Sequence, residues 1–82
     1  MNKFFVYILK SVRDRKYYYG HTSYLGKRLK CHNSGKVKST KSRRPLRLHY
    51  SEEYSCKSDA LKREKFFKSI DGYNWLKENE II

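Results

Sequence analysis

The sequence predicts an α/β fold in which a small three-stranded antiparallel sheet packs against helices, as a single domain over residues 1–82. A chain of 82 residues has room for one domain with a thin core. The hydrophobic fraction, 38% of the residues, is low for a globular chain. The aromatic fraction of 16% is high, and large rings can build a small core. Strand patterns occur near 3–10, 16–21 and 46–51, and helix patterns near 24–33 and 57–70, followed by a short C-terminal helix.

Residues 3–10 form a continuous apolar and β-branched run between two lysines. Such a run is typical of a central strand that is covered on both faces. Alternate side chains face opposite sides, with Phe5, Tyr7 and Leu9 on one face and Phe4, Val6 and Ile8 on the other. The polar segment that follows predicts a hairpin loop.

A tyrosine-rich strand follows the hairpin, and Tyr18 faces opposite to Tyr17 and Tyr19. We expect this strand to turn at Gly20 and to lead into a helix near 24–33 with Ser23 as its N-cap.

The helix has Leu25 and Leu29 on its core stripe. Arg28 and His32 lie one turn apart at the border between this stripe and solvent. A border position suits side chains that packing must hold and that a substrate must reach.

The segment from Ser34 to Pro45 has no apolar periodicity, and we expect a mobile basic loop after a helix end at Gly35. Residues 46–50 then alternate strictly, which predicts a third strand with one dry face. The cations of the loop are candidate nucleic-acid contacts: Lys36, Lys38, Lys41, Arg43 and Arg44.

The second helix, near 57–70, begins after Ser55 as a predicted cap and has Ala60, Leu61 and Phe67 on its apolar stripe. Glu64 falls within this stripe, where a carboxylate is costly unless it is paired or binds a cation. Two interpretations stay open, a metal ligand or a helix-surface pair with Lys68 or Lys57. A turn at Asp71–Gly72 should lead to a short helix whose Trp75 closes the core.

The net charge of +12, from 20 Lys and Arg against 8 Asp and Glu, favours an anionic partner. Nucleic acid is the first candidate, an anionic membrane surface the second, and a charged surface without a partner the third. We expect no membrane span, a cytoplasmic location, and free thiols at Cys31 and Cys56. Cys31 and His32 point apart on a helix, so a zinc site there is not expected.

Several motifs together resemble the GIY-YIG nuclease superfamily: Phe5-Val6-Tyr7, Tyr18-Tyr19-Gly20, Arg28-x-x-x-His32, and Glu64 on a later helix. The chain is most similar to the small stand-alone members related to the nuclease domain of the excision-repair subunit UvrC. The resemblance runs from Phe4 to about Leu76. Phe5 departs from the family's first glycine and Tyr19 from its middle isoleucine. Asn74 is the candidate for the family's late asparagine.

The resemblance implies hydrolysis of DNA phosphodiesters with one divalent metal ion, Mg²⁺ or Mn²⁺. Elementary chemistry agrees that Arg28 suits the developing charge on phosphoryl oxygens and that Glu64 suits a hard cation. Tyr7 resembles the family's general base, and a free phenol has a pKa near 10. Either Arg28 and the metal would have to lower this pKa, or a metal-bound water would take the role of the base. Tyr18 and His32 would orient the phosphate or relay a proton.

The main hypothesis is therefore a metal-dependent DNA endonuclease in repair or recombination. The alternatives are a non-catalytic nucleic-acid-binding module of the same fold and a role on structured RNA. If the site residues are only structural, Tyr7 and Tyr18 are core rings and Arg28 is an ion-pair residue. For either hypothesis we expect His21 and His49 to be structural or exposed rather than catalytic. We expect a monomer whose sequence specificity is low or comes from a protein partner.

Overall fold

The structure is a computed structural model that describes residues 3–82. Its strands form one antiparallel sheet in the order β2-β1-β3, so the first strand is central as predicted. The elements in chain order are β1 (Phe4–Ser11), β2 (Tyr17–Thr22), α1 (Leu25–Asn33), the 3₁₀ helix η1 (Lys41–Arg43), β3 (Leu46–Tyr54), α2 (Lys57–Phe67) and α3 (Ile70–Glu78). The predicted fold class is confirmed.

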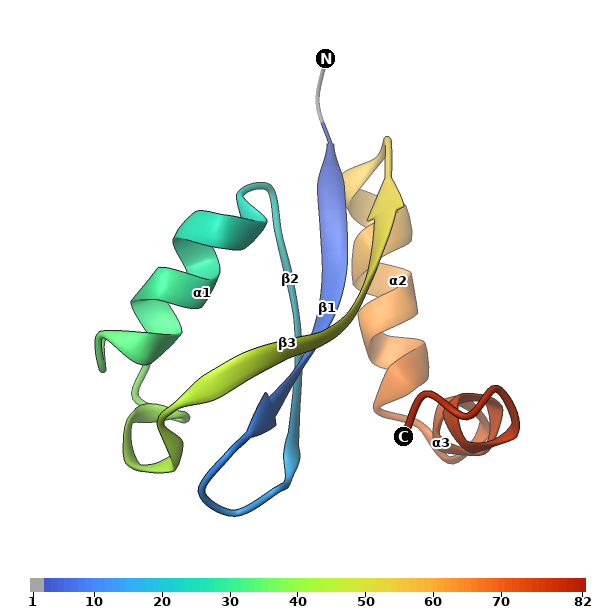
Figure 1. Cartoon of the computed structure of the whole chain (residues 1–82). Helices are drawn as coiled ribbons and strands as arrows, with labels where there is room; N and C mark the ends of the chain where they lie inside the picture. The colour runs from blue at the N-terminus through green and yellow to red at the C-terminus, as the bar shows by residue number, and fades with distance from the viewer. Residues whose placement is uncertain (1–2) are drawn as a thin grey trace.

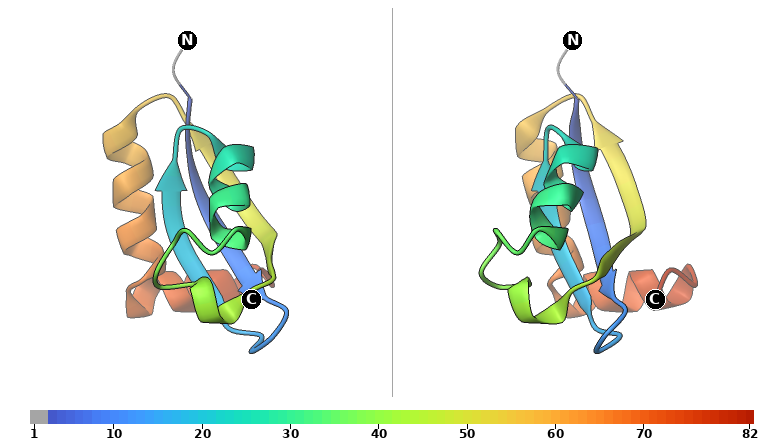
Figure 2. Two further views of the ribbon diagram at one scale, coloured as in Figure 1. Left: turned by 90° about the vertical axis from the view of Figure 1, so that its left-hand side faces the viewer. Right: turned by 60° about the vertical axis from the view of Figure 1, so that its left-hand side comes forward.

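The sheet lies between two helical layers, with α1 on one face and α2 on the other, and α3 crosses near the end of α2 (Figures 1 and 2). On the α1 side, Leu25 and Leu29 pack against buried residues of the sheet, namely Tyr7, Leu9 and Leu46. On the α2 side, the buried core consists of Val6, Ile8, Phe67 and Leu76, and Trp75 packs against it. The prediction that alternate side chains of β1 face opposite sides of the sheet is confirmed for the buried ones: Val6 and Ile8 on the α2 side, Tyr7 and Leu9 on the α1 side.

A β-bulge in β3 overturns the predicted single dry face of this strand. Ile8 pairs with Tyr50 and Leu9 pairs with Leu48, so His49 is an extra residue without a partner on β1. Because one extra residue reverses the alternation, Leu46 packs on the α1 side and Tyr50 on the α2 side.

Three local predictions are wrong at the element ends. Neither Ser23 nor Ser55 caps a helix, because the N-cap positions are Tyr24 and Cys56 and no side chain caps them. The second helix ends at Phe67 instead of near residue 70.

The residues Asp71 and Gly72 lie inside α3 instead of forming a turn. Ser69 caps this helix, since its Oγ accepts a bond from the Gly72 amide at 3.1 Å. A Cβ atom at Gly72 would overlap the carbonyl of Phe66, so glycine allows α3 to approach the end of α2 closely.

The basic loop is anchored, contrary to the expected mobile segment. Thr40 is completely buried, and the Ser11 hydroxyl donates to the Arg43 carbonyl at 2.6 Å. Arg43 also donates to Asp14 at 3.0 Å. The other cations of the loop, at 36, 38, 41 and 44, remain exposed. Of the described residues, no helix is long and apolar enough to cross a membrane.

Candidate active site

A cavity of about 200 Å³ opens at the β2 edge of the sheet, between α1 and α2. Four of the predicted site residues line it, each from a different element: Tyr7 from β1, Tyr18 from β2, Arg28 from α1 and Glu64 from α2. The structure therefore brings these side chains to one cavity that is open to solvent.

His32 does not line the cavity but lies behind it, completely buried, which corrects its predicted border position. Its Nε2 is 3.0 Å from the Tyr7 hydroxyl, and its Nδ1 is 2.8 Å from the Thr40 hydroxyl. The ring also packs edge-on against Tyr18, with centroids 4.9 Å apart. His32 thus touches both tyrosines of the site from the protein interior.

The hydrogen-bond pattern favours one tautomer of His32. The Thr40 hydroxyl lies 3.5 Å from the Val37 carbonyl, to which it can donate, so it accepts from Nδ1–H of His32. Nε2 then carries no proton and accepts the hydroxyl hydrogen of Tyr7. Burial, with a smaller contribution from Arg28, lowers the pKa of His32 to about 4, so the ring is neutral near pH 7.

Burial raises the pKa of Tyr7, and the hydrogen bond from Arg28 offsets this effect only in part. The Arg28 Nε donates to the Tyr7 oxygen at 3.5 Å. Arg28 by itself therefore does not bring the pKa of Tyr7 below its ordinary value. Near neutral pH the residue is a phenol whose hydrogen points to His32 and whose oxygen lone pairs face Arg28.

Gly20 permits this position of Tyr7. It lies within β2 opposite Tyr7, not at the predicted turn. A Cβ atom at Gly20 would be 2.5 Å from the Tyr7 oxygen and 2.6 Å from Cζ. A side chain of any size there would displace the phenol ring.

Glu64 is already hydrogen-bonded at both carboxylate oxygens. His21 Nδ1 lies 2.6 Å from Oε1 and Lys68 Nζ lies 2.8 Å from Oε2, with 14% of the Glu64 side chain exposed. Burial alone would raise the pKa of Glu64, but the bonds from Lys68 and His21 outweigh it and lower the pKa. The predicted pairing with Lys68 is confirmed, and Arg28 does not pair with Glu64.

These residues do not fit a divalent metal ion held by protein ligands alone, but they can hold a hydrated one. Within residues 3–82 no group of three or more His, Cys, Asp or Glu side chains could hold a metal ion. Mg²⁺ commonly binds through one or two carboxylates, waters and substrate phosphates. A carboxylate has about four lone-pair positions, so Glu64 can accept further contacts beside those from His21 and Lys68.

Asn74 lies on the exposed surface of α3 and does not line this cavity. Thr40 and His21 contact the site residues but were not predicted to belong to the site. Thr40 lies in a polar segment without periodicity, so nothing in the local pattern marks it as buried. His21 directly follows Gly20, yet its partner is 43 residues away in the chain.

Residues 3–74 match the family model of the GIY-YIG catalytic domain. The chain belongs to the GIY-YIG domain family.

Within this family it is similar to small proteins of one group. A UPF0213 protein of Bacillus licheniformis is 43% identical over 74 residues, covering 89% of this chain and 75% of the relative. A UPF0213 protein of Staphylococcus haemolyticus is 42% identical over 78 residues, covering 94% of each chain. The solution NMR structure of the UPF0213 protein BH0048 from Bacillus halodurans superimposes with a TM-score of 0.55 at 33% identity, covering 93% of this chain and 83% of the other.

Proposed function

We propose that this protein is a metal-dependent endonuclease that hydrolyses phosphodiester bonds of DNA. The observation that carries the proposal is the single cavity lined by two phenols, a guanidinium and a carboxylate, with a neutral imidazole bonded to one phenol. Membership of the GIY-YIG family supports the same chemistry.

In this proposal Arg28 binds the phosphate that is cleaved. It is permanently charged, no carboxylate among the described residues pairs with it, and it lines the cavity beside Tyr7. Its planar fork can hold two phosphoryl oxygens and stabilise the charge that accumulates on them.

Tyr7 accepts a proton from the attacking water at its lone pairs while its own hydrogen moves to Nε2 of His32. The orientation of the hydroxyl, set by His32 and Thr40, makes this transfer possible without a phenolate. Tyr18, on the neighbouring strand β2, orients the phosphate.

Glu64 would hold the divalent ion, with the exposed Lys68 able to move aside because 52% of its side chain is accessible. The ion, when bound, would supply Lewis-acid polarisation of a phosphoryl oxygen.

A role in DNA repair or recombination, in the cytoplasm, is part of the proposal. A monomer with little sequence specificity, or with specificity supplied by a partner protein, agrees with the small size of the domain.

Cleavage of supercoiled, single-stranded and branched DNA, with and without Mg²⁺ or Mn²⁺, tests the proposal. Glu64→Gln, Arg28→Gln and Tyr7→Phe should each reduce cleavage by about a hundredfold or more while DNA binding persists. Tyr73→Phe is the matched control for Tyr7→Phe, because Tyr73 is an exposed tyrosine on α3, and it should cleave like the wild type.

One observation favours the alternative of a nucleic-acid-binding module without turnover. Both oxygens of Glu64 are engaged by His21 and Lys68, as a purely structural carboxylate would be. A wild-type protein that binds every DNA and cuts none with either metal would overturn the nuclease proposal and leave this alternative.

A further inference from the structure

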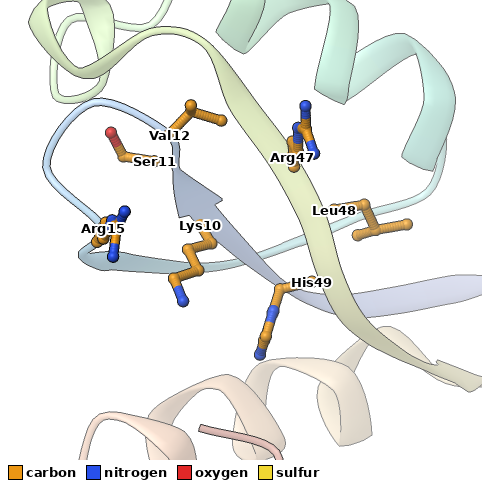
Figure 3. A pocket seen from close by; sticks show the side chains of 7 residues that line it. All are labelled: Lys10, Ser11, Val12, Arg15, Arg47, Leu48 and His49. Atoms are coloured by element: carbon orange, nitrogen blue, oxygen red, sulfur yellow. The ribbon is translucent and has the colours of Figure 1, made fainter.

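A second hollow, of about 340 Å³, opens where β1 ends (Figure 3). Its walls come from the end of β1, the β1–β2 hairpin and the bulged part of β3. Its basic side chains are Lys10, Arg15, Arg47 and His49, and no acidic residue of the described part of the chain lines it. None of its lining residues belongs to the candidate active site.

Within residues 3–82, no carboxylate forms an ion pair with a cation of this hollow. Lys10 and Arg47 are cross-strand partners of β1 and β3, so the hollow carries positive charge on two neighbouring strands. Among the described residues, the carboxylates that form ion pairs bind other side chains: Lys3, His21, Arg43, Arg63 and Lys68.

Two of the basic side chains in the hollow, Lys10 and His49, are held in place before any ligand arrives. The Lys10 ammonium lies 5.4 Å from the ring centroid of Tyr17, and the His49 ring lies 5.1 Å from the same ring. His49 also donates from Nε2 to the Ile81 carbonyl. Side chains that are already ordered lose less entropy when they bind a ligand.

The hairpin beside the hollow is fixed to the basic loop of residues 36–44. The Val12 amide donates to the Pro45 carbonyl at 2.9 Å, and Arg43 bonds Asp14 of the hairpin at 3.0 Å. The cations of the loop and those of the hollow are therefore neighbours, and one extended polyanion can contact both. This continuity favours a polynucleotide over a free anion.

We propose that this hollow binds a backbone phosphate of DNA at a position remote from the phosphate that is cleaved. The inference rests on DNA being the substrate, as proposed above. Lys10, Arg15 and Arg47 bind the phosphate, and the site extends the DNA contact from the basic loop onto the outer strand β3.

Salt-dependent DNA binding tests this assignment in a Glu64→Gln background with a metal chelator, where cleavage cannot interfere. The triple variant Lys10→Gln, Arg15→Gln, Arg47→Gln is compared with Lys57→Gln, Lys62→Gln, Lys77→Gln, which removes the same charge from exposed positions of α2 and α3. The probe is a fluorescent duplex of known length, titrated at several salt concentrations.

We expect the hollow variant to bind the duplex at least tenfold more weakly than the control variant. Its slope of log K against log salt should be smaller by about one for each phosphate that the variant no longer neutralises. Equal affinities and equal slopes of the two triple variants would overturn the proposal. Because no cleavage is measured, this result is independent of whether the wild type is a nuclease.

Amide NMR shifts of the wild-type protein supply a test that needs no variant of the hollow. The duplex should shift the amides of Lys10, Arg15 and Arg47 at far lower concentration than inorganic phosphate does. Shifts with inorganic phosphate but none with the duplex would assign the hollow to a free anion and overturn the proposal.

Discussion

At the scale of single residues, the candidate site depends on Thr40, which lies outside the motifs, as well as on His32 and Gly20, which belong to them. Thr40 fixes the tautomer of His32, His32 orients the Tyr7 hydroxyl, and Gly20 leaves room for the Tyr7 ring. The geometry of Tyr7 is thus set by three residues from three different parts of the chain.

Replacing Gly20 with alanine should displace Tyr7. We expect Gly20→Ala to lower the free energy of unfolding by about 1–3 kcal/mol through overpacking and to reduce DNA cleavage strongly. Gly26→Ala is the matched control, because nothing lies within 4 Å of a Cβ at this helical position. This control should stabilise the protein by about 0.5–1 kcal/mol, and urea unfolding measures both.

His32 should make the protein less stable in mild acid. Its pKa is about 4 in the folded protein against 6.5 in the unfolded chain, so the unfolded state binds more protons between these values. The contribution of the neutral His32 ring to stability is then complete well above pH 6.5 and decreases with falling pH, by about 1.6 kcal/mol between pH 6.5 and pH 5.

The difference between the unfolding curves of the wild type and His32→Gln isolates this effect, because contributions shared by both proteins cancel. We expect the pH dependence in this window to be weaker in His32→Gln. Parallel curves for the two proteins would show that His32 does not titrate in this way. Tyr7, Tyr18, Arg28 and Thr40 surround the ring, and of these Arg28 carries the charge that opposes protonation.

At the scale of elements, a polar cluster joins β3 to α2 on the side of the sheet away from α1. Glu52 accepts bonds from Arg63 at 2.8 Å and from the hydroxyls of Tyr50 and Tyr54. The Arg63 guanidinium also stacks over Trp75, 4.2 Å from its ring centroid. The cluster fixes α2, and with it Glu64, against the sheet.

Glu52→Gln should therefore destabilise the protein by about 1–3 kcal/mol, because it leaves the half-buried Arg63 without its carboxylate. Glu53→Gln is the control, because Glu53 is exposed. Its ion pair with Lys3, at 3.7 Å, lies on the surface and contributes little to stability. Chemical unfolding of both variants checks the difference, and equal losses would contradict the role given to Glu52.

The same cluster predicts the alkaline titration of its tyrosines. Burial and the hydrogen bond to Glu52 raise the pKa values of Tyr50 and Tyr54 to about 12. Their stabilising effect is present below pH 10 and is lost as the pH rises toward 12. Tyrosinate absorbance should show two late-titrating groups in the wild type that ionise earlier in Glu52→Gln.

At the scale of the whole molecule, the charge of +12 has two opposite consequences. Repulsion among the cations destabilises the folded domain, whereas the same charge attracts DNA. Added salt screens both effects.

Raising the salt concentration from about 0.05 M to about 0.5 M should therefore increase the melting temperature and decrease DNA affinity. Thermal unfolding and fluorescence anisotropy in the same buffers measure the two quantities. A fall of both with added salt would contradict the dominance of self-repulsion in the folded domain.

The sequence by itself determined the elements and, apart from β3, the faces of the strands, because strand alternation and helical periodicity are local properties of the chain. It thus predicted the central first strand, the two-sided packing of Val6 and Tyr7, and the spacing that puts Arg28 and His32 on one side of α1. It also predicted Glu64 beside Lys68, since a helix fixes residues four apart.

Only the tertiary structure decided the contacts between distant segments. The burial of His32, the bond from His21 to Glu64, the anchoring of the basic loop by Thr40 and the bulge at His49 all depend on how separate elements meet. Local patterns are fixed by backbone geometry over a few residues. The environment of a titratable group is fixed by whatever the fold packs against it, and no local period encodes that.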